Sequence, residues 1–249
     1  MSDPEVTPVG DGVVRISWTT ATTIDAVRLT VATALDEGAH RVEAYVDPAD
    51  VVAQRAATFS GLRKEGVSRG IDAREDRIVY ARLASDVPAD QPEGFRALLN
   101  SFLPRKRAIS QLLVRDPDDR VLLCNLTYKR DWDLPGGVVE VGESPQLAVE
   151  REVQEELALS LKAGDLLLTD WLPPWSGWDD ALCLVFDGGV QDAAIVDRIV
   201  RQEREIRTAE FCTVEQARER CADFTARRLE SALANVGGGT PSYVESGGV

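Results

Sequence analysis

The sequence predicts an α/β (α+β) protein made of two domains. The first observation is that strand-like and helix-like patterns alternate along residues 13–83 and again along residues 108–232. Such alternation is typical of α/β units. The second is a polar, proline-punctuated stretch over residues 84–104 that separates the two runs. The third is the length of 249 residues with 44% apolar residues, which is typical of a globular chain of one large or two ordinary domains.

The first domain, residues 1–86, is expected to fold in the order β-α-β-α-β. The expected strands are Val13–Trp18, Arg41–Val46 and Arg77–Leu83, and the expected helices are Ile24–Leu35 and Asp50–Glu65. β-Branched residues and alternation predict the strands, and apolar residues at helical spacing predict the helices. Asp47-Pro48 breaks the middle strand, and Gly66 suits the end of the second helix.

Residues 87–104 are expected to form a linker, residues 105–235 the second domain and residues 236–249 a disordered tail, which is rich in Gly and Ser. The expected strands of the second domain are Ala108–Val114, Val121–Asn125, Leu166–Trp171 and Ala181–Phe186, and the expected helices are Pro145–Leu157 and Val214–Ala232. The turn-rich segment 116–119 joins the first two strands.

Acidic residues outnumber basic ones, with 42 Asp and Glu against 28 Lys and Arg, and the net charge is −14. This surplus argues against binding of nucleic acid, whose phosphates need clustered Lys and Arg, and against anionic membrane surfaces. No apolar run approaches the roughly 18 residues needed to span a bilayer. We therefore expect a cytoplasmic protein that acts on a small molecule.

The chain has a single histidine, His40, and four cysteines without C-x-x-C spacing. A Ser-His-Asp triad would depend on that one histidine, and a zinc site with several histidines is impossible. The cysteines lie in apolar runs, where they are more often small core residues. The composition therefore favours chemistry carried by carboxylates.

Three glutamates in the helix expected over Pro145–Leu157 form a candidate metal site. Glu152, Glu155 and Glu156 are spaced at i, i+3 and i+4, so they lie on one helix face and repel one another. Arg151 offsets part of this charge, and a divalent cation offsets it better. Hard oxygen ligands on a rigid helix suit Mg²⁺ or Mn²⁺, which also bind substrate phosphates.

The residues before this helix support the same interpretation. Gly136-Gly137 follows Leu134-Pro135 in a tight turn, where glycines let the backbone approach a ligand closely. Ser144 is a candidate N-cap, and Pro145 takes the first helical position. Glu143 stands directly before them.

The segment from Gly137 to Leu159 resembles the Nudix box, G-x5-E-x7-R-E-U-x-E-E-x-G-U, where U is a bulky aliphatic residue. Every letter matches except that Ala158 replaces the family's glycine. Alanine there should cost about 1 kcal/mol if its φ is positive. The resemblance covers roughly residues 105–233. It implies the Nudix fold, in which a mixed sheet lies between helices, and hydrolysis of a nucleoside diphosphate linked to another moiety.

The resemblance also implies roles for individual residues. The implied metal ligands are the carbonyl of Gly136 and the carboxylates of Glu152, Glu155 and Glu156, with Mg²⁺ or Mn²⁺ as the cofactor. Arg151 would orient and partly neutralise the glutamates together with Glu143. Gly137 is the first box residue. ADP-ribose-like compounds and nucleoside triphosphates are both open as substrates, and a module that binds nucleotides without hydrolysis is the alternative.

Two features lie outside the box. A general base is expected among Glu203, Glu205 and Glu210, and we favour Glu205, although all three also fit exposed surface charges. Aromatic residues cluster near Pro173-Pro174, namely Trp171, Trp175 and Trp178. A loop tryptophan such as Trp175 either stacks on a nucleobase or wedges the loop onto the sheet.

Residues 41–86 resemble the later half of a GNAT-type N-acetyltransferase. The resemblance lies in Tyr45-Val46-Asp47, in Gly61–Val67, which is similar to the family's GF-x-x-EG turn, and in Asp76–Leu83. Thr19–Asp25 contains no Gly, so the loop that cradles the pyrophosphate of acetyl-coenzyme A is missing and acetyl transfer is the weaker hypothesis. A truncated sheet leaves an unpaired edge. We expect this edge to form a homodimer or to pack on the second domain.

Overall fold

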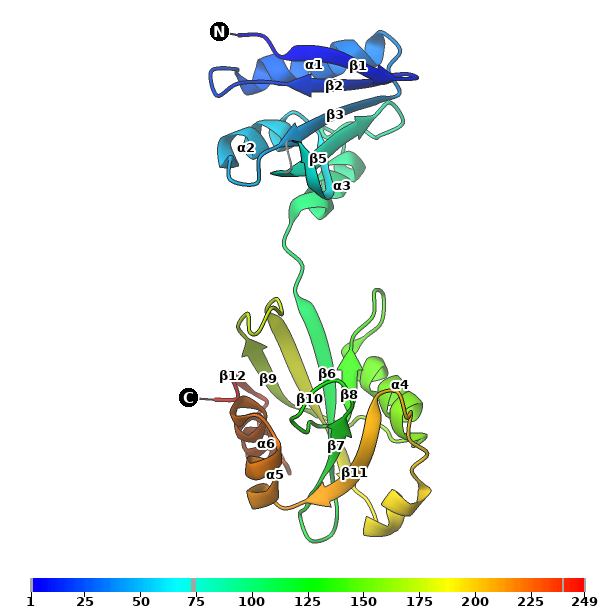
Figure 1. Ribbon diagram of the computed structural model, residues 1–249. Helices are drawn as coiled ribbons and strands as arrows, with labels where there is room; N and C mark the ends of the chain where they lie inside the picture. The colour runs from blue at the N-terminus through cyan, green and yellow to red at the C-terminus, as the bar shows by residue number, and fades with distance from the viewer. Residues whose placement is uncertain (1, 73–74, 239, 249) are drawn as a thin grey trace. The chain divides into compact units, whose positions relative to one another are not determined.

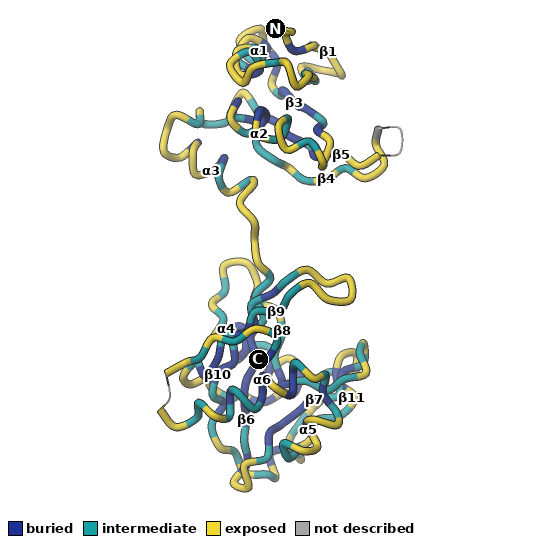
Figure 2. Tube along the Cα trace, turned by 90° about the vertical axis from the view of Figure 1, so that its left-hand side faces the viewer, coloured by how far each residue is buried: buried dark blue, intermediate teal, exposed yellow. Residues whose placement is uncertain are grey.

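The computed structural model describes residues 2–72, 75–238 and 240–248. The chain divides into two compact units, Met1–Pro104 and Arg105–Val249 (Figure 1). Buried residues gather along the strands and the inner helix faces of each unit (Figure 2). Each unit therefore has a hydrophobic core of its own.

The first unit contains, within its described residues, a five-stranded sheet in the order β1-β2-β3-β5-β4. Its strands are β1 (Glu5–Gly10), β2 (Val13–Ser17), β3 (Arg41–Val46), β4 (Arg63–Asp72) and β5 (Glu75–Leu83), and its helices are α1 (Ile24–Asp36), α2 (Val51–Phe59) and α3 (Pro92–Phe102). Only β2 and β3 pair in parallel among these described neighbours. The GNAT-type resemblance and the homodimer stay predictions.

Helix α2 is shorter than the sequence predicts, because the expected helix over Asp50–Glu65 ends at Phe59. Gly61 takes a left-handed φ of +85°, and the amide of Leu62 donates to the carbonyl of Ala57. The chain therefore turns there and enters β4, which the helical pattern concealed. Strand β1 is a further element that the residue pattern did not predict.

The linker expected over residues 87–104 contains helix α3. Pro92 occupies the first turn, Leu98 is buried, and the Ser101 hydroxyl accepts a hydrogen bond from the Lys64 amide. A Cβ on Gly94 would overlap the carbonyl oxygens of Val87 and Pro88. The glycine and prolines that suggested a linker therefore serve close packing of a helix.

The second unit contains a mixed sheet of seven strands in its described part, in the order β11-β7-β6-β10-β9-β12 with β8 paired to β6. Its strands are β6 (Arg107–Arg115), β7 (Val121–Leu126), β8 (Gly136–Val138), β9 (Leu166–Leu172), β10 (Ala181–Val190), β11 (Ile206–Cys212) and β12 (Ser242–Glu245), and its helices are α4 (Pro145–Leu157), the 3₁₀ helix η1 (Ala193–Arg198), α5 (Val214–Arg220) and α6 (Asp223–Ala234). The pairs β10–β6 and β12–β9 are parallel.

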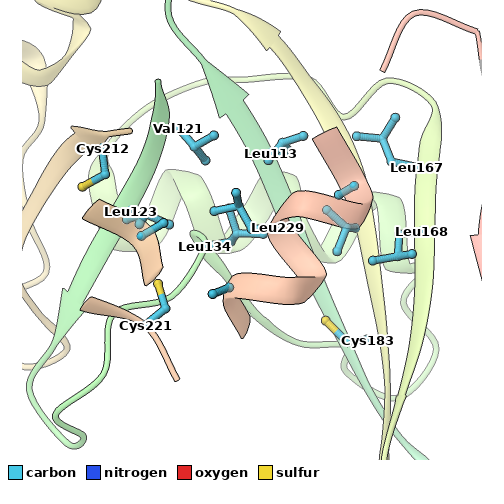
Figure 3. Packing of buried hydrophobic residues seen from close by; sticks show 14 residues of the cluster. Leu113, Val121, Leu123, Leu134, Leu167, Leu168, Cys183, Cys212, Cys221 and Leu229 are labelled. Carbon is cyan, nitrogen blue, oxygen red and sulfur yellow. The ribbon is translucent and has the colours of Figure 1, made fainter. Parts of the chain in front are cut away.

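Helices cover both faces of this sheet (Figure 1). Leu113 of β6 packs in one core cluster with Leu229 of α6, and Figure 3 shows this cluster. The neighbouring Leu112 packs in a second cluster with Val153 of α4. Successive side chains of a strand point to opposite faces, so the two clusters form the two interfaces of an α/β/α sandwich, as the sequence predicts.

Two expectations for the end of the chain are wrong in detail. The helix expected over Val214–Ala232 breaks at Cys221, which has an extended backbone between α5 and α6. The tail expected to be disordered from residue 236 contains β12, which pairs with β9. The side-chain amide of Asn235 donates to the Ser242 hydroxyl, 2.6 Å away. Polar tail residues thus find partners that composition does not reveal.

No helix among the described residues combines the length and the apolar character needed to cross a bilayer.

Candidate functional site

Helix α4 carries the clustered glutamates and begins and ends at identifiable residues. The Ser144 hydroxyl accepts a hydrogen bond from the Leu147 amide, and Pro145 lies in the first turn. The helix ends at Ala158, whose φ of 56° and ψ of 29° are left-handed. A left-handed residue ends many helices, and glycine is usually favoured there. The alanine therefore keeps the expected cap geometry at a conformational cost.

Gly136 and Gly137, which the sequence places in a tight turn, instead belong to strand β8 and lie too close to their neighbours to carry a side chain. A Cβ on Gly137 would lie 2.5 Å from the carboxyl carbon of Glu152. A Cβ on Gly136 would overlap the carbonyl oxygen of Ser110, and the φ of Gly136 is +136°. Strand β8 therefore lies directly against the glutamate face of α4.

Arg151 links the carboxylates around it. Its guanidinium donates to both oxygens of Glu143, at 3.0 and 3.1 Å. It also donates to Glu152 Oε1 and Glu155 Oε2, each at 3.0 Å. These contacts, with Glu143 foremost, raise the pKa of Arg151. One cation thus holds three carboxylates in position.

Glu156, unlike these three carboxylates, forms no ion pair with a cation among the described residues. Its side chain is buried, with the residue 5% exposed, and its Oε2 has no hydrogen-bond partner among the described residues. Burial and the charge of Glu152 raise the pKa of Glu156 to about 8, and Glu205 adds to the effect. Burial also raises the pKa of Glu152. The cluster therefore carries more negative charge than its surroundings neutralise.

This excess of hard oxygen donors fits a divalent cation. The backbone of Gly136 lies next to the carboxyl of Glu156 and favours its charged form, so two of the residues predicted to hold the metal are neighbours. Within the described chain, no group of three or more His, Cys, Asp and Glu residues stands in a ready metal-holding arrangement. Oxygens of Glu152 and Glu155 bond to Arg151 instead. The uncompensated oxygen of Glu156 is the part of the cluster that a cation would satisfy.

The three candidate bases have different surroundings. The carbonyl of Glu205 accepts from the Thr127 amide, and the Gln202 amide donates to the carbonyl of Glu156, both at 2.8 Å. The charge of Glu205 contributes to the raised pKa values of Glu152 and Glu156. Glu210 instead forms an ion pair with Arg220. Glu203 has no comparable link to the cluster in the described residues.

A cavity of about 480 Å³ opens beside strand β8. Gly136 and Gly137 line one part of it, and Trp175 and Trp178 line another. The Trp175 ring packs edge-on against Phe224 at 5.7 Å between centroids. Both tryptophans remain more than half exposed. They therefore offer aromatic surface to a ligand.

Trp171 lies outside the lining of this cavity. Its indole nitrogen donates to Asp180 at 3.4 Å. Its side chain is only partly exposed, so it serves packing.

The sequence analysis missed a chain of buried polar groups beside the cavity. Arg228 of α6 donates to Asp170 of β9 at 2.8 Å and to the side-chain oxygen of Gln111 at 3.1 Å. The Gln111 amide donates to Asp133 at 2.7 Å, and Lys129 pairs with Asp133 at 2.6 Å. The only sequence signal was Asp170, a lone charge inside an apolar strand. Nothing in the sequence separates the buried Arg228 from the exposed Arg227 beside it.

Comparison with known proteins adds an independent finding. The family model described as the NUDIX domain matches residues 104–232. A MutT-like protein of Streptomyces ambofaciens is 31% identical over 134 residues, which cover 52% of this chain and 78% of that protein. The nucleoside triphosphatase NudI of Escherichia fergusonii is 33% identical over 93 residues, covering 35% of this chain and 61% of that protein.

Solved structures resemble about half of the chain. A MutT protein from Methanosarcina mazei Go1 has a TM-score of 0.46 and 23% identity, covering 54% of this chain and 97% of that one. An ADP-ribose pyrophosphatase from Streptococcus suis has a TM-score of 0.39 and 17% identity, covering 57% of this chain and 99% of that one.

Proposed function

We propose that this chain, which belongs to the NUDIX domain family and is a hydrolase of phosphorus anhydrides, cleaves nucleoside diphosphates linked to a further group with the help of Mg²⁺ or Mn²⁺. The observation that carries the proposal is the buried, unpartnered Oε2 of Glu156 inside a cluster of like charges. A divalent metal ion that binds together with the diphosphate brings positive charge to these oxygens.

The residues that would hold the metal are neighbours on α4 and β8. They are the Gly136 carbonyl and the carboxylates of Glu152, Glu155 and Glu156. When bound there, the ion supplies neutralisation of the diphosphate and activation of water. Arg151 keeps the glutamates in place through its hydrogen bonds.

Glu205 is our candidate for the general base. Its charge acts on Glu152 and Glu156, and backbone hydrogen bonds hold its segment at the end of α4. A base must lie within hydrogen-bond reach of the attacking water, directly or through one water molecule. A carboxylate beside the cluster meets this need better than Glu210, which Arg220 neutralises.

The cavity supports a nucleotide as the substrate class. Its volume lies in the range of small-molecule sites, and Trp175 and Trp178 present rings on which a base can stack. The name of the relative from Escherichia fergusonii makes nucleoside triphosphates the first class to test. ADP-ribose-like diphosphates are the second.

The test is a screen of nucleoside triphosphates and diphosphate derivatives with Mg²⁺ or Mn²⁺, followed by phosphate release. We expect metal-dependent turnover that Glu156→Gln lowers on the order of a hundred- to a thousandfold. Glu150→Gln is the matched control, because Glu150 lies on the same helix and pairs with Lys162. Equal loss in both variants would contradict a specific role of Glu156, and no turnover of any compound would favour a module that only binds nucleotides.

A further inference from the structure

The polar chain beside the cavity is balanced in charge. Arg228 pairs with Asp170, and Lys129 pairs with Asp133. The neutral Gln111 joins the two pairs, since its amide donates to Asp133 and its oxygen accepts from Arg228. Two positive and two negative groups therefore offset each other. A charged ligand group would upset this balance in a buried place.

One hydrogen-bond donor among these buried polar groups has no acceptor. Arg228 is 2% exposed, its Nε donates to Asp170 and its Nη1 donates to Gln111. Its Nη2 has no hydrogen-bond partner in the described part of the chain. Arg228 also lines the cavity. A buried donor without an acceptor is costly, and a ligand in the cavity would supply the acceptor.

The surroundings of Arg228 suit a flat and neutral group. Its guanidinium lies over the Phe224 ring at 5.6 Å, and Phe224 in turn contacts Trp175. Aromatic side chains therefore lie beside the guanidinium that carries the unpartnered N–H. A nucleobase can stack on such rings and still present a polar edge to the arginine.

We propose that Arg228 selects the base of the substrate by donating from Nη2 to the 6-keto oxygen of a purine or the 4-keto oxygen of a pyrimidine, so that guanine and uracil bind better than adenine and cytosine. Arginine has donors and no acceptor. Where guanine or uracil presents a carbonyl oxygen, adenine or cytosine presents an amino group, and two donors would then face each other. The inference rests on the proposed function, because it takes the cavity as the nucleotide site.

The test measures binding rather than hydrolysis. Nucleoside monophosphates are titrated in the presence of a chelator, and quenching of tryptophan fluorescence reports occupancy beside Trp175 and Trp178. We expect GMP and UMP to bind at least about tenfold more tightly than AMP and CMP, as one base-edge hydrogen bond allows. IMP, which keeps only the 6-keto group, should bind like GMP, and the monophosphate of 2,6-diaminopurine should bind like AMP.

Arg228→Lys is the decisive variant. Lysine keeps a positive charge for Asp170 but lacks the second nitrogen of the fork. We expect the preference for keto bases to fall below about threefold. The matched control is Arg218→Lys, because Arg218 forms an exposed ion pair with Glu230. This control should keep the preference.

The outcomes separate this inference from the proposed function. Binding with keto preference but no turnover would support the role of Arg228 and overturn the hydrolysis. Turnover with equal binding of IMP and AMP would support the hydrolysis and overturn the role of Arg228. Absence of binding by all the monophosphates would overturn the role of Arg228. If Arg228→Lys fails to fold, the analogue series on the unaltered protein decides the question.

Discussion

Among the buried atoms of the second unit that lack a hydrogen-bond partner in the described residues, Glu156 Oε2 and Arg228 Nη2 differ in sign and in setting. Glu156 Oε2 on α4 lies among carboxylates whose charge exceeds that of Arg151. Arg228 Nη2 on α6 lies in a chain where each charge has an opposite partner. The two helices cover opposite faces of one sheet.

The comparison shows that the charge around an unpaired atom decides which ligand it fits. At Glu156 the surroundings carry excess negative charge, so the site favours a cation. At Arg228 the surroundings are neutral in sum, so the site favours a dipolar acceptor over an anion. Burial is similar at the two places and does not separate them.

The largest expected effect follows from removing the carboxylate that pairs with Arg228. Asp170→Asn leaves a buried guanidinium without its carboxylate, and we expect the free energy of unfolding to fall by about 3–5 kcal/mol. Urea denaturation followed by tryptophan fluorescence measures it. Glu230→Gln removes the carboxylate of the exposed pair with Arg218 and should cost less than about 1 kcal/mol. Equal costs would mean that the Arg228 pair is not desolvated.

A second prediction uses pH to separate the two regions in metal-free protein. The pKa of Glu156 is raised from its ordinary 4.5 to about 8, so the folded state holds this proton more tightly than the unfolded state. Stability should therefore fall by roughly 3–4 kcal/mol as the pH rises from about 5 to about 8. Glu156→Gln should abolish this slope, and a slope that persists in the variant would contradict the assignment.

The polar chain should respond in the opposite direction. Burial opposes ionisation of Asp133, yet Lys129 and Arg228 hold its pKa below the ordinary 3.8. Its contribution to stability is therefore present above that value and is lost as the pH falls through the lowered pKa. The Glu156→Gln variant should keep this acid-side loss, which unfolding curves at low pH would reveal.

The sequence predicts the glutamate cluster of α4 but not the polar groups around Arg228. The glutamates of α4 belong to one helix, so their spacing alone predicts a shared face. The partners of Arg228 come from β6 and β9, and the Gly247 amide of the tail donates to Asp170 as well. Such a network forms only when distant segments meet. Periodicity along the chain carries no information about it.

The same limit explains why some helices and strands were not predicted. Strands with alternating or β-branched residues, such as β3, were predicted within a residue. Helix α3 and strand β12 were missed because Gly, Pro and Ser served as the signal for loops. In α3 the close approach of Gly94 to the chain before it required a glycine, and β12 depends on pairing with β9.

The smallest expected effect concerns the end of α4, beside the glutamates. Ala158 holds a φ of 56°, which costs an L-residue with a Cβ about 1 kcal/mol relative to glycine. Ala158→Gly should therefore raise the free energy of unfolding by up to about 1 kcal/mol, despite the greater freedom of glycine in the unfolded chain. Ala234→Gly, at the last helical residue of α6, is the matched control and should destabilise, since its backbone is helical. If both substitutions destabilise, the left-handed cap carries no strain, and Ala158 would be as well suited to this position as the family's glycine.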